Sequence, residues 1–513
     1  MKTRLVSALL VACLALCAVK VSAQQIPFLD DLLVRSAAFY KLYNEKRRAG
    51  MKFDAFEPLR KRGEVQFRSG NVPGILETLA EGSALLEGKA WDERQRFIAS
   101  LTIEADRLVM EPNQELSLSL VRIFPTSTDK AFGAQPTVTF LIAPAGKQTS
   151  SEAKPQRPAG PITLTERIPI GEAQAGAARR LTLADGAYTI IARIEAGGQQ
   201  VADITQPLYV INDFSDQLAQ LSKQVAAIKS SNDAKVKAVA ALVATPEFQI
   251  ERLRPLNKGR SEVVINPIDE LDLIEARLAA LAKGENPFAA ERGEIERAYQ
   301  ATDGKLIPYR LFVPASYDGK AARPLVVLLH GALGDERTFF SDLYDPATVK
   351  GEAERRGYIL AAVNGRSRFS SYRDAAGDDP LEVAAAVMRN YQIDPARVYL
   401  AGHSMGGFGT WVVAARKPEL FAALAPMSAG PPAQDDELKA LLEKLKPLPA
   451  LVVHGAKDGI LPPDLSKQMV EAAQKAGLQV TYLEVPDADH LTVIGASFAA
   501  VLDFFDKHAK TIK

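Results

Sequence analysis

Residues 402–407 read Gly-His-Ser-Met-Gly-Gly, a pattern that can place a nucleophile in a sharp turn. Residues 397–401 before it are rich in β-forming side chains, and residues 408–416 after it have the composition of a helix. A strand, a Gly-x-Ser-x-Gly turn and a helix in this order predict a nucleophile elbow, in which strained backbone exposes the serine at a helix N-terminus. The pattern therefore predicts Ser404 as a nucleophile and the backbone N–H of Met405 as an oxyanion donor.

A serine hydroxyl needs a general base to become a strong nucleophile, and the chain contains five histidines. His490 lies in the loop after the strand expected at residues 480–485, and we predict that it is the base. The other four fit this role less well: His330 opens an oxyanion-type loop, His403 adjoins the nucleophile and points away from its proton, His454 ends a strand, and His508 is expected to face solvent from the last helix.

The general base needs a carboxylate that fixes its tautomer and stabilises the imidazolium. Asp458 lies in a loop after an expected strand, and the chain order Ser404, Asp458, His490 is the order of α/β-hydrolases. We therefore predict that Asp458 is the acid. Asp487 and Asp489 compete by proximity, but neighbouring residues seldom reach the imidazole ring, so we interpret them as solvated or as loop hydrogen-bonding groups.

The loop that begins at His330 continues Gly-Ala-Leu-Gly after a buried strand, where an oxyanion loop belongs. We predict the backbone N–H of Ala332 as its donor, with Leu333 as an alternative that the sequence leaves open. No His, Cys or Asp cluster has metal-ligand spacing and HExxH is absent, so no metal or cofactor is expected. Five loop residues could line a pocket or simply pack within their loops: Phe339, Phe340, Phe369, Tyr372 and Ile460.

The second half of the chain must hold these groups. From about residue 295 onward, short apolar strands alternate with amphipathic helices, and residues 324–329 form a continuous apolar run. Repeated strand–helix alternation predicts a doubly wound, mostly parallel sheet over residues 286–513. Together with the elbow and the order Ser404, Asp458, His490, this sheet indicates an α/β-hydrolase catalytic domain. Its helices are expected at residues 347–356, 380–391, 405–416, 435–445 and 465–476.

The first half of the chain shows a different pattern. Helical periodicity covers residues 24–101 and 213–285, and between them residues 102–212 alternate with period two. Several short strands with turns predict an immunoglobulin-like β-sandwich, with a hairpin at Asp185-Gly186 and a further turn at Gly197-Gly198. No catalytic constellation precedes Glu285. We therefore expect the front half to position an independently folding catalytic domain; the alternative is that it covers the active-site mouth.

Residues 1–23 have the anatomy of a secretory signal peptide, with basic residues, an apolar run and a small-residue cleavage site. This predicts a periplasmic or extracellular protein. The run is too short for a transmembrane segment, and it continues past Cys13, so lipoprotein processing is the less favoured alternative. Cleavage would remove both cysteines and leave 59 basic against 62 acidic residues, a net charge of −3. That balance gives no case for nucleic-acid binding, and oligomeric state is not predicted.

Longer stretches carry a family resemblance. Residues 391–411 read Tyr-Gln-Ile-Asp-Pro-Ala-Arg-Val-Tyr-Leu-Ala-Gly-His-Ser-Met-Gly-Gly-Phe-Gly-Thr-Trp, and residues 418–426 read Pro-Glu-Leu-Phe-Ala-Ala-Leu-Ala-Pro. His-Gly-Ala-Lys-Asp at 454–458 and Pro-Asp-Ala-Asp-His at 486–490 complete the set. From about residue 290, the chain resembles secreted bacterial α/β-hydrolases of the polyhydroxybutyrate depolymerase, feruloyl esterase and predicted peptidase cluster. Dienelactone hydrolases look similar but usually carry a cysteine where this chain has Ser404.

The resemblance implies a serine hydrolase that acts on esters or, less often, on amides. We expect a carboxylic-ester hydrolase that works through an acyl-enzyme. A serine peptidase is the alternative, because related folds pair an N-terminal β domain with this catalytic domain; the front half lacks the repeated blades of a propeller, which favours the ester. A binding protein with an inactive hydrolase fold is a third possibility, against which the complete Ser404, Asp458 and His490 set argues.

Overall fold

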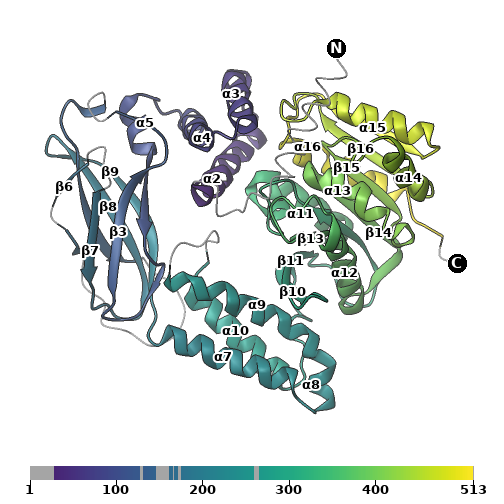
Figure 1. The fold of residues 1–513 in the computed structure, drawn as a ribbon, viewed down its shortest axis with the longest axis horizontal. Coiled ribbons are helices and arrows are strands. Elements are labelled where there is room, and N and C mark those ends of the chain that lie inside the picture. Colours follow the sequence, from purple (N-terminus) through teal and green to yellow (C-terminus); the bar gives the residue numbers. More distant parts are fainter. Residues whose placement is uncertain are drawn as a thin grey trace. The chain divides into compact units, whose positions relative to one another are not determined.

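The computed structural model describes residues 28–127, 131–145, 161–165, 167–170, 175–258 and 265–511. The predicted signal peptide, residues 1–23, and most of the loop expected at 145–161 lie outside these ranges. Two compact units make up the chain (Figure 1). Unit 1 includes Tyr40–Lys52 and Phe288–Lys513, and unit 2 comprises Phe28–Phe39 and Phe53–Pro287. Within the described ranges, no helix combines the length and apolar character needed to span a membrane.

Unit 1 is built on an eight-stranded sheet with the order β10-β11-β13-β12-β14-β15-β16-β17. The pairs β10–β11 and β11–β13 are antiparallel, and all other neighbours are parallel, as the strand–helix alternation predicted. The strands are β10 (Gly293–Gln300), β11 (Leu306–Val313), β12 (Arg323–Leu329), β13 (Ile359–Val363), β14 (Ile393–His403), β15 (Ala423–Met427), β16 (Ala450–Gly455) and β17 (Val480–Val485).

The central strands β12 and β13 are buried along nearly their whole length, because helices cover both faces of the sheet. One hydrophobic cluster joins side chains of the central strands, such as Val326 and Tyr399, to those of two helices, such as Val349 and Phe498. The helical segments of this part are α11 (Pro346–Arg356), α12 (Asp374–Asn390), α13 (Met405–Ala414), α14 (Asp435–Leu445), α15 (Pro463–Lys475) and α16 (Val493–Asp506), with the short turns η5 (Thr338–Phe340), η6 (Asp342–Tyr344) and η7 (Pro418–Leu420).

One helix begins earlier than its sequence suggested. Pro380 was expected near an N-terminus, but α12 begins at Asp374 and Pro380 lies inside it, fully within the buried face. Proline removes one backbone donor, and this helix continues through the missing bond. Unit 1 also contains more than the residues 286–513 expected for the catalytic domain, because it includes Tyr40–Lys52 from the front of the chain.

Unit 2 contains two β-sheets that share one hydrophobic cluster, to which Leu118, Phe140 and Ile190 contribute. A three-stranded sheet has the order β1-β3-β7, and a second sheet has the order β2-β9-β8-β4-β5, with β6 also paired to β4. The strands are β1 (Leu101–Ala105), β2 (Val109–Met110), β3 (Glu115–Arg122), β4 (Thr137–Pro144), β5 (Ile162–Thr163), β6 (Ile168–Pro169), β7 (Ala175–Arg180), β8 (Gly186–Ala196) and β9 (Gln199–Val210). Their immunoglobulin-like character stays a prediction.

The hairpin predicted at Asp185-Gly186 is wrong. The strand before it, β7, pairs with β3, whereas β8 after it pairs with β4 and β9 in the other sheet. The residues between β7 and β8 do not fold back, because Leu181 instead exchanges backbone hydrogen bonds with the turn at Asn113 and Gln114. The turn at Gly197-Gly198, by contrast, does join two antiparallel strands, β8 and β9.

Helices occupy the segments of the front half that showed helical periodicity. Helix α2 (Leu29–Arg48) begins in unit 2 and ends in unit 1. The remaining helical segments of unit 2 are η2 (Asp54–Phe56), α3 (Glu57–Arg68), α4 (Val72–Leu86), α5 (Glu93–Ala99), α7 (Phe214–Lys229), α8 (Ala234–Val239), η3 (Ala240–Val243), α9 (Ala244–Leu253), η4 (Arg254–Asn257) and α10 (Pro267–Ala282).

Candidate active site

Ser404 lies between the end of β14 and the start of α13, at φ 52° and ψ −116°. A non-glycine residue held there is strained and needs support from its surroundings. The flanking glycines make the turn possible: a Cβ on Gly402 would come within 2.1 Å of the Gly406 carbonyl oxygen, and one on Gly406 within 2.0 Å of the Leu329 oxygen. The Ser404 N–H donates to the Met427 oxygen on β15 at 2.9 Å. The strand, strained turn and helix predicted for the elbow are therefore present.

His490 and Asp458 lie at the same edge of the sheet, in the loops that follow β17 and β16. The His490 Nδ1 lies 2.7 Å from the Asp458 Oδ2, and both side chains are buried. The other carboxylate oxygen, Oδ1, accepts from the N–H groups of Ile460 and Leu461 at 2.9 and 2.8 Å. Because a carboxylate only accepts, the His490 Nδ1 carries the proton and Nε2 is the nitrogen suited to act as a base.

A second histidine supports Asp458. His454 Nε2 lies 3.1 Å from the Asp458 Oδ2, and its Nδ1 lies 2.7 Å from the Ser466 Oγ. Burial would raise the pKa of Asp458, but the charge of His490 and the hydrogen bonds from His454 and His490 hold it well below its usual range. Asp458 is therefore a carboxylate at neutral pH. The sequence placed His454 at a strand end and did not predict this contact.

The two competing aspartates have other partners. Asp487 is exposed and pairs with the Lys457 Nζ at 3.0 Å. Asp489 Oδ1 accepts from the backbone N–H groups of Leu491 and Thr492 at 3.0 and 2.9 Å, where the chain turns towards α16. This geometry supports the interpretation of both as surface or loop groups, in contrast to Asp458.

His403 is buried and connects several parts of the site. Its Nε2 lies 2.6 Å from the backbone oxygen of His490 and its Nδ1 2.6 Å from the Tyr344 hydroxyl. Burial, reinforced by the charge of His490, lowers the pKa of His403 well below its usual value, so the ring is neutral. The Nε2–H then donates to the carbonyl, and Nδ1 accepts from the hydroxyl of Tyr344. Both ring nitrogens of His403 therefore have partners, and one of these partners is the backbone of His490, our candidate base.

The loop after β12 approaches the elbow. A Cβ on Gly331 would lie 3.3 Å from the Ser404 Cβ. Leu333 has a left-handed φ of 67°, and its N–H donates to the Arg368 carbonyl at 2.9 Å. That donor is thus already used, which favours Ala332 as the oxyanion donor from this loop. Met405 is the first residue of α13, and a helix has no internal acceptor for the N–H at that position.

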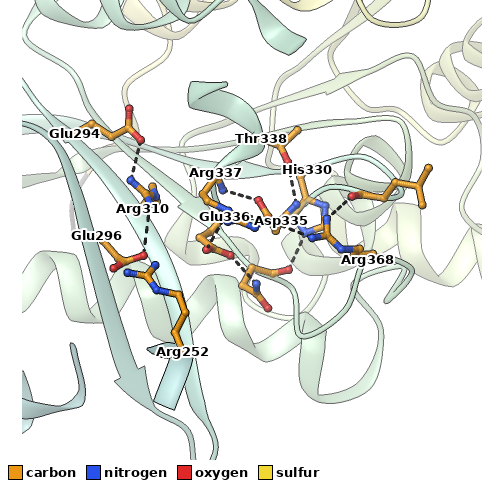
Figure 2. A network of polar contacts seen from close by, with 12 residues as sticks. Arg252, Glu294, Glu296, Arg310, His330, Asp335, Glu336, Arg337, Thr338 and Arg368 are labelled. Carbon is orange, nitrogen blue, oxygen red and sulfur yellow. Dashed lines mark hydrogen bonds and ion pairs between the residues drawn. The ribbon is translucent and has the colours of Figure 1, made fainter. Parts of the chain in front are cut away.

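Figure 2 shows the polar network behind this loop. The Nη1 of Arg368 donates to the backbone oxygen of Leu333 at 2.5 Å, and its Nη2 lies 3.4 Å from the Asp335 Oδ2. The Arg337 Nε also donates to the Asp335 Oδ2, at 3.1 Å. Burial would raise the pKa of Asp335, but Arg337 and Arg368 lower it to about 2. Burial and the charge of Asp335 raise the pKa of the adjacent Glu336, whose Oε2 accepts from Asn364.

This network predicts a pH-dependent stability difference for Asp335→Asn. Because the folded pKa of Asp335 is below its unfolded value, its carboxylate stabilises the fold fully above about pH 4 and loses that contribution as the pH falls towards 2. We expect the variant to be less stable by about 2 kcal/mol at pH 7, with the difference shrinking below pH 4. Urea unfolding of both proteins between pH 7 and 2.5 measures it, and a constant difference would contradict the assignment.

The remaining predicted residues have structural environments. His330 holds its loop by contacts from Nδ1 to the Gly331 oxygen and from Nε2 to the Asn364 oxygen, both 2.7 Å. His508 follows the end of α16, half-buried, with Nδ1 2.7 Å from the Phe504 oxygen, so it does not simply face solvent. Among the five suggested pocket residues, three are buried and pack within the protein: Phe339, Phe340 and Tyr372.

Sequence reasoning missed Tyr344 and Arg368, which bond to His403 and to the loop of Ala332. Tyr344 also accepts from the Gly331 N–H at 3.4 Å. Neither residue belongs to a local motif, since each lies in a turn far along the chain from its partner. The signal that could have found them is placement: both follow strands at the carboxyl edge of a parallel sheet, where sites form.

Comparison with known proteins places relatives in the same part of the chain. The model of the prolyl oligopeptidase family matches residues 354–430. Poly(3-hydroxyalkanoate) depolymerase C of Paucimonas lemoignei is 52% identical over 42 residues, 8% of this chain and 10% of the depolymerase. Feruloyl esterase B of Neurospora crassa is 33% identical over 123 residues, 22% of this chain and 41% of the esterase. This chain thus covers less than half the length of either relative.

Among solved structures, the crystal structure of a thermostable esterase matches with a TM-score of 0.34 and 16% identity, over 80% of this chain and 100% of the esterase. The sequence relatives also include acetylxylan esterases. The sequence relatives confirm the resemblance expected from the elbow and loop motifs. In its C-terminal part, the chain is similar in sequence to polyhydroxyalkanoate depolymerases and to feruloyl and acetylxylan esterases, and this part has the α/β-hydrolase fold.

Proposed function

We propose that the protein is a serine hydrolase that cleaves carboxylic esters, with Ser404 as nucleophile, His490 as general base and Asp458 as its orienting carboxylate. The observation that carries the proposal is the 2.7 Å His490–Asp458 contact at the same sheet edge where a strand–helix elbow holds Ser404 at φ 52°. The ester relatives support the substrate class. Ala332 and Met405 are the proposed oxyanion donors.

The proposed reaction has two steps. The Ser404 Oγ attacks the ester carbonyl while the His490 Nε2 takes its proton, and the N–H groups of Ala332 and Met405 bind the resulting oxyanion. His490 then gives the proton to the departing alcohol, which leaves an acyl group on Ser404. Water, activated by the same imidazole, hydrolyses the acyl-enzyme. Asp458 stays ionised throughout and stabilises the imidazolium form of His490.

The substrate class is tested with matched chromogenic substrates. We expect p-nitrophenyl acetate to be turned over and aminoacyl p-nitroanilides to be cleaved orders of magnitude more slowly. Acetyl, feruloyl and hydroxybutyryl esters, compared by kcat/KM, then define the acyl group. Preferential cleavage of the anilide would overturn the ester assignment, and no cleavage of either class would favour a binding protein.

A serine peptidase is the second candidate, because the matching family model is that of the prolyl oligopeptidases. The same elbow and histidine would serve amide cleavage, since the acyl-enzyme chemistry is shared. Export is the further part of the proposal: the signal-peptide anatomy of residues 1–23 supports a periplasmic or extracellular enzyme. N-terminal sequencing of the secreted protein should begin at Gln24.

A further inference from the structure

The last turns of α2, within Tyr40–Lys52, belong to unit 1 together with the catalytic residues, although they are encoded near the start of the chain. Asn44, only 4% exposed, donates its Nδ2 to the backbone oxygen of Asp342 at 2.8 Å. Arg47 and Arg48 both bind Asp345, through Nη2 to Oδ2 at 2.5 Å and through Nη1 to Oδ1 at 2.7 Å. Each carboxylate oxygen therefore has its own arginine.

Asp345 is 3% exposed and has a left-handed φ of 55° at the N-cap of α11. Thr348 Oγ1 donates to its Oδ2 at 2.9 Å. A Cβ on Gly495, in the first turn of α16, would come within 2.7 Å of the Asp345 Cβ. A carboxylate buried in this way needs its cationic partners, since removing them leaves an uncompensated charge. The two arginines are therefore the partners on which this turn depends.

The turn that Asp345 ends carries Tyr344. The hydroxyl of Tyr344 accepts from the Gly331 N–H, which precedes the proposed oxyanion donor, and lies 2.6 Å from the Nδ1 of His403. His403 in turn bonds to the backbone oxygen of His490. The side chain of Tyr344 thus contacts the oxyanion loop directly, and it is linked through the ring of His403 to the main chain of His490, the proposed general base.

We propose that Arg47 and Arg48 are positioning residues of the active site: by holding Asp345 they hold Tyr344 against Gly331 and His403. Residues 40–52 then belong to the catalytic machinery, and a catalytic fragment that begins at residue 286 lacks part of it. This inference rests on the proposed function, because the reaction it tunes is the one assigned to Ser404.

The test uses the full chain with Arg47→Ala/Arg48→Ala. We expect kcat for p-nitrophenyl acetate to fall about tenfold with KM within about twofold, because small displacements of catalytic groups cost rate more than affinity. Tyr344→Phe should cause a similar loss. Since both act through one contact, combining them should lower kcat by no more than about threefold beyond either alone. Arg47→Lys/Arg48→Lys, which keeps the charges, should recover most of the rate.

The matched control is Arg193→Ala/Arg254→Ala, which removes two arginines of unit 2 that pair with surface carboxylates. It should leave kcat unchanged. A lowered Tm with unchanged kcat in the Arg47/Arg48 variant would mean a merely structural contact and overturn the proposal. Fully additive losses with Tyr344→Phe would also overturn it. If the alanine pair does not fold, Asp345→Asn takes its place in the same cycle.

Amide hydrogen exchange separates this inference from the proposed function. In the Arg47→Ala/Arg48→Ala variant we expect exchange about tenfold faster in residues 340–349 and 486–492, with the β12 and β14 strands unaffected. If the wild-type protein cleaves no ester, the proposed function fails while faster exchange still supports the positioning contact. Unchanged exchange in both segments overturns the contact whatever the activity.

Discussion

Ser404→Ala is expected to fold normally and to lose ester hydrolysis by about 10⁵- to 10⁶-fold in kcat, because members of a catalytic triad act as a unit. The elbow backbone does not depend on the hydroxyl, since the Ser404 N–H bonds to Met427 and its carbonyl oxygen accepts from Phe408. Turnover of p-nitrophenyl acetate, with Tm and circular dichroism as controls for folding, measures the effect.

The control for this variant is a serine close by that has no proposed role. Ser428 follows β15 at the same sheet edge, and it is buried. Ser428→Ala should keep kcat within about threefold of wild type, as expected for a residue outside the reacting groups. Substantial turnover by a pure Ser404→Ala preparation would remove Ser404 from its role, and the elbow would then be a structural turn.

Asp458→Asn should lower kcat by about 10⁴-fold while KM changes little, because an amide misorients the base and no longer stabilises the imidazolium. The carboxylate of Asp458 accepts four contacts at once, from two backbone N–H groups and two imidazoles. An asparagine of the same shape can keep the backbone contacts on its oxygen, so we expect the fold to survive. Steady-state kinetics with the soluble ester give both constants.

Asp487→Asn and Asp489→Asn are the matched controls, since both residues lie within three positions of His490. Asp487 is exposed on a surface pair with Lys457, and its variant should retain full activity. Asp489 organises the turn before α16 and its variant should cost mainly stability. If either variant lost more rate than Asp458→Asn, the acid would be misassigned.

The local parts of the fold could be predicted from the sequence because their physical causes are local. The elbow at Ser404 follows from two glycines between a β-rich run and a helix, and steric clashes at Gly402 and Gly406 explain why no larger side chain fits. Chain order also brought Asp458 and His490 to one edge, since loops after parallel strands meet there. These predictions needed periodicity, turn chemistry and the order in which α/β-hydrolases carry their catalytic residues along the chain.

Contacts between distant segments could not be predicted in this way. The Asp-Gly pair at 185–186 has the composition of a hairpin, but pairing partners in different sheets decided its geometry. Pro380 resembles a helix start, and only its packing keeps it inside α12. Tyr344, His403 and Arg368 carry no motif that names their partners. Such contacts depend on tertiary packing, which overrides local propensity.

The ion pairs of Arg47 and Arg48 with Asp345 have a consequence for the order of folding. Its partners lie 298 and 297 positions apart, so the contact closes a chain loop that contains nearly all of unit 2. During synthesis, α2 is complete long before the turn that it binds, and domains generally fold as units as the chain emerges. Closing so long a loop adds only modest entropy cost, but it is slow compared with local steps. The full catalytic rate is therefore expected to be reached last, after both hydrophobic cores have formed.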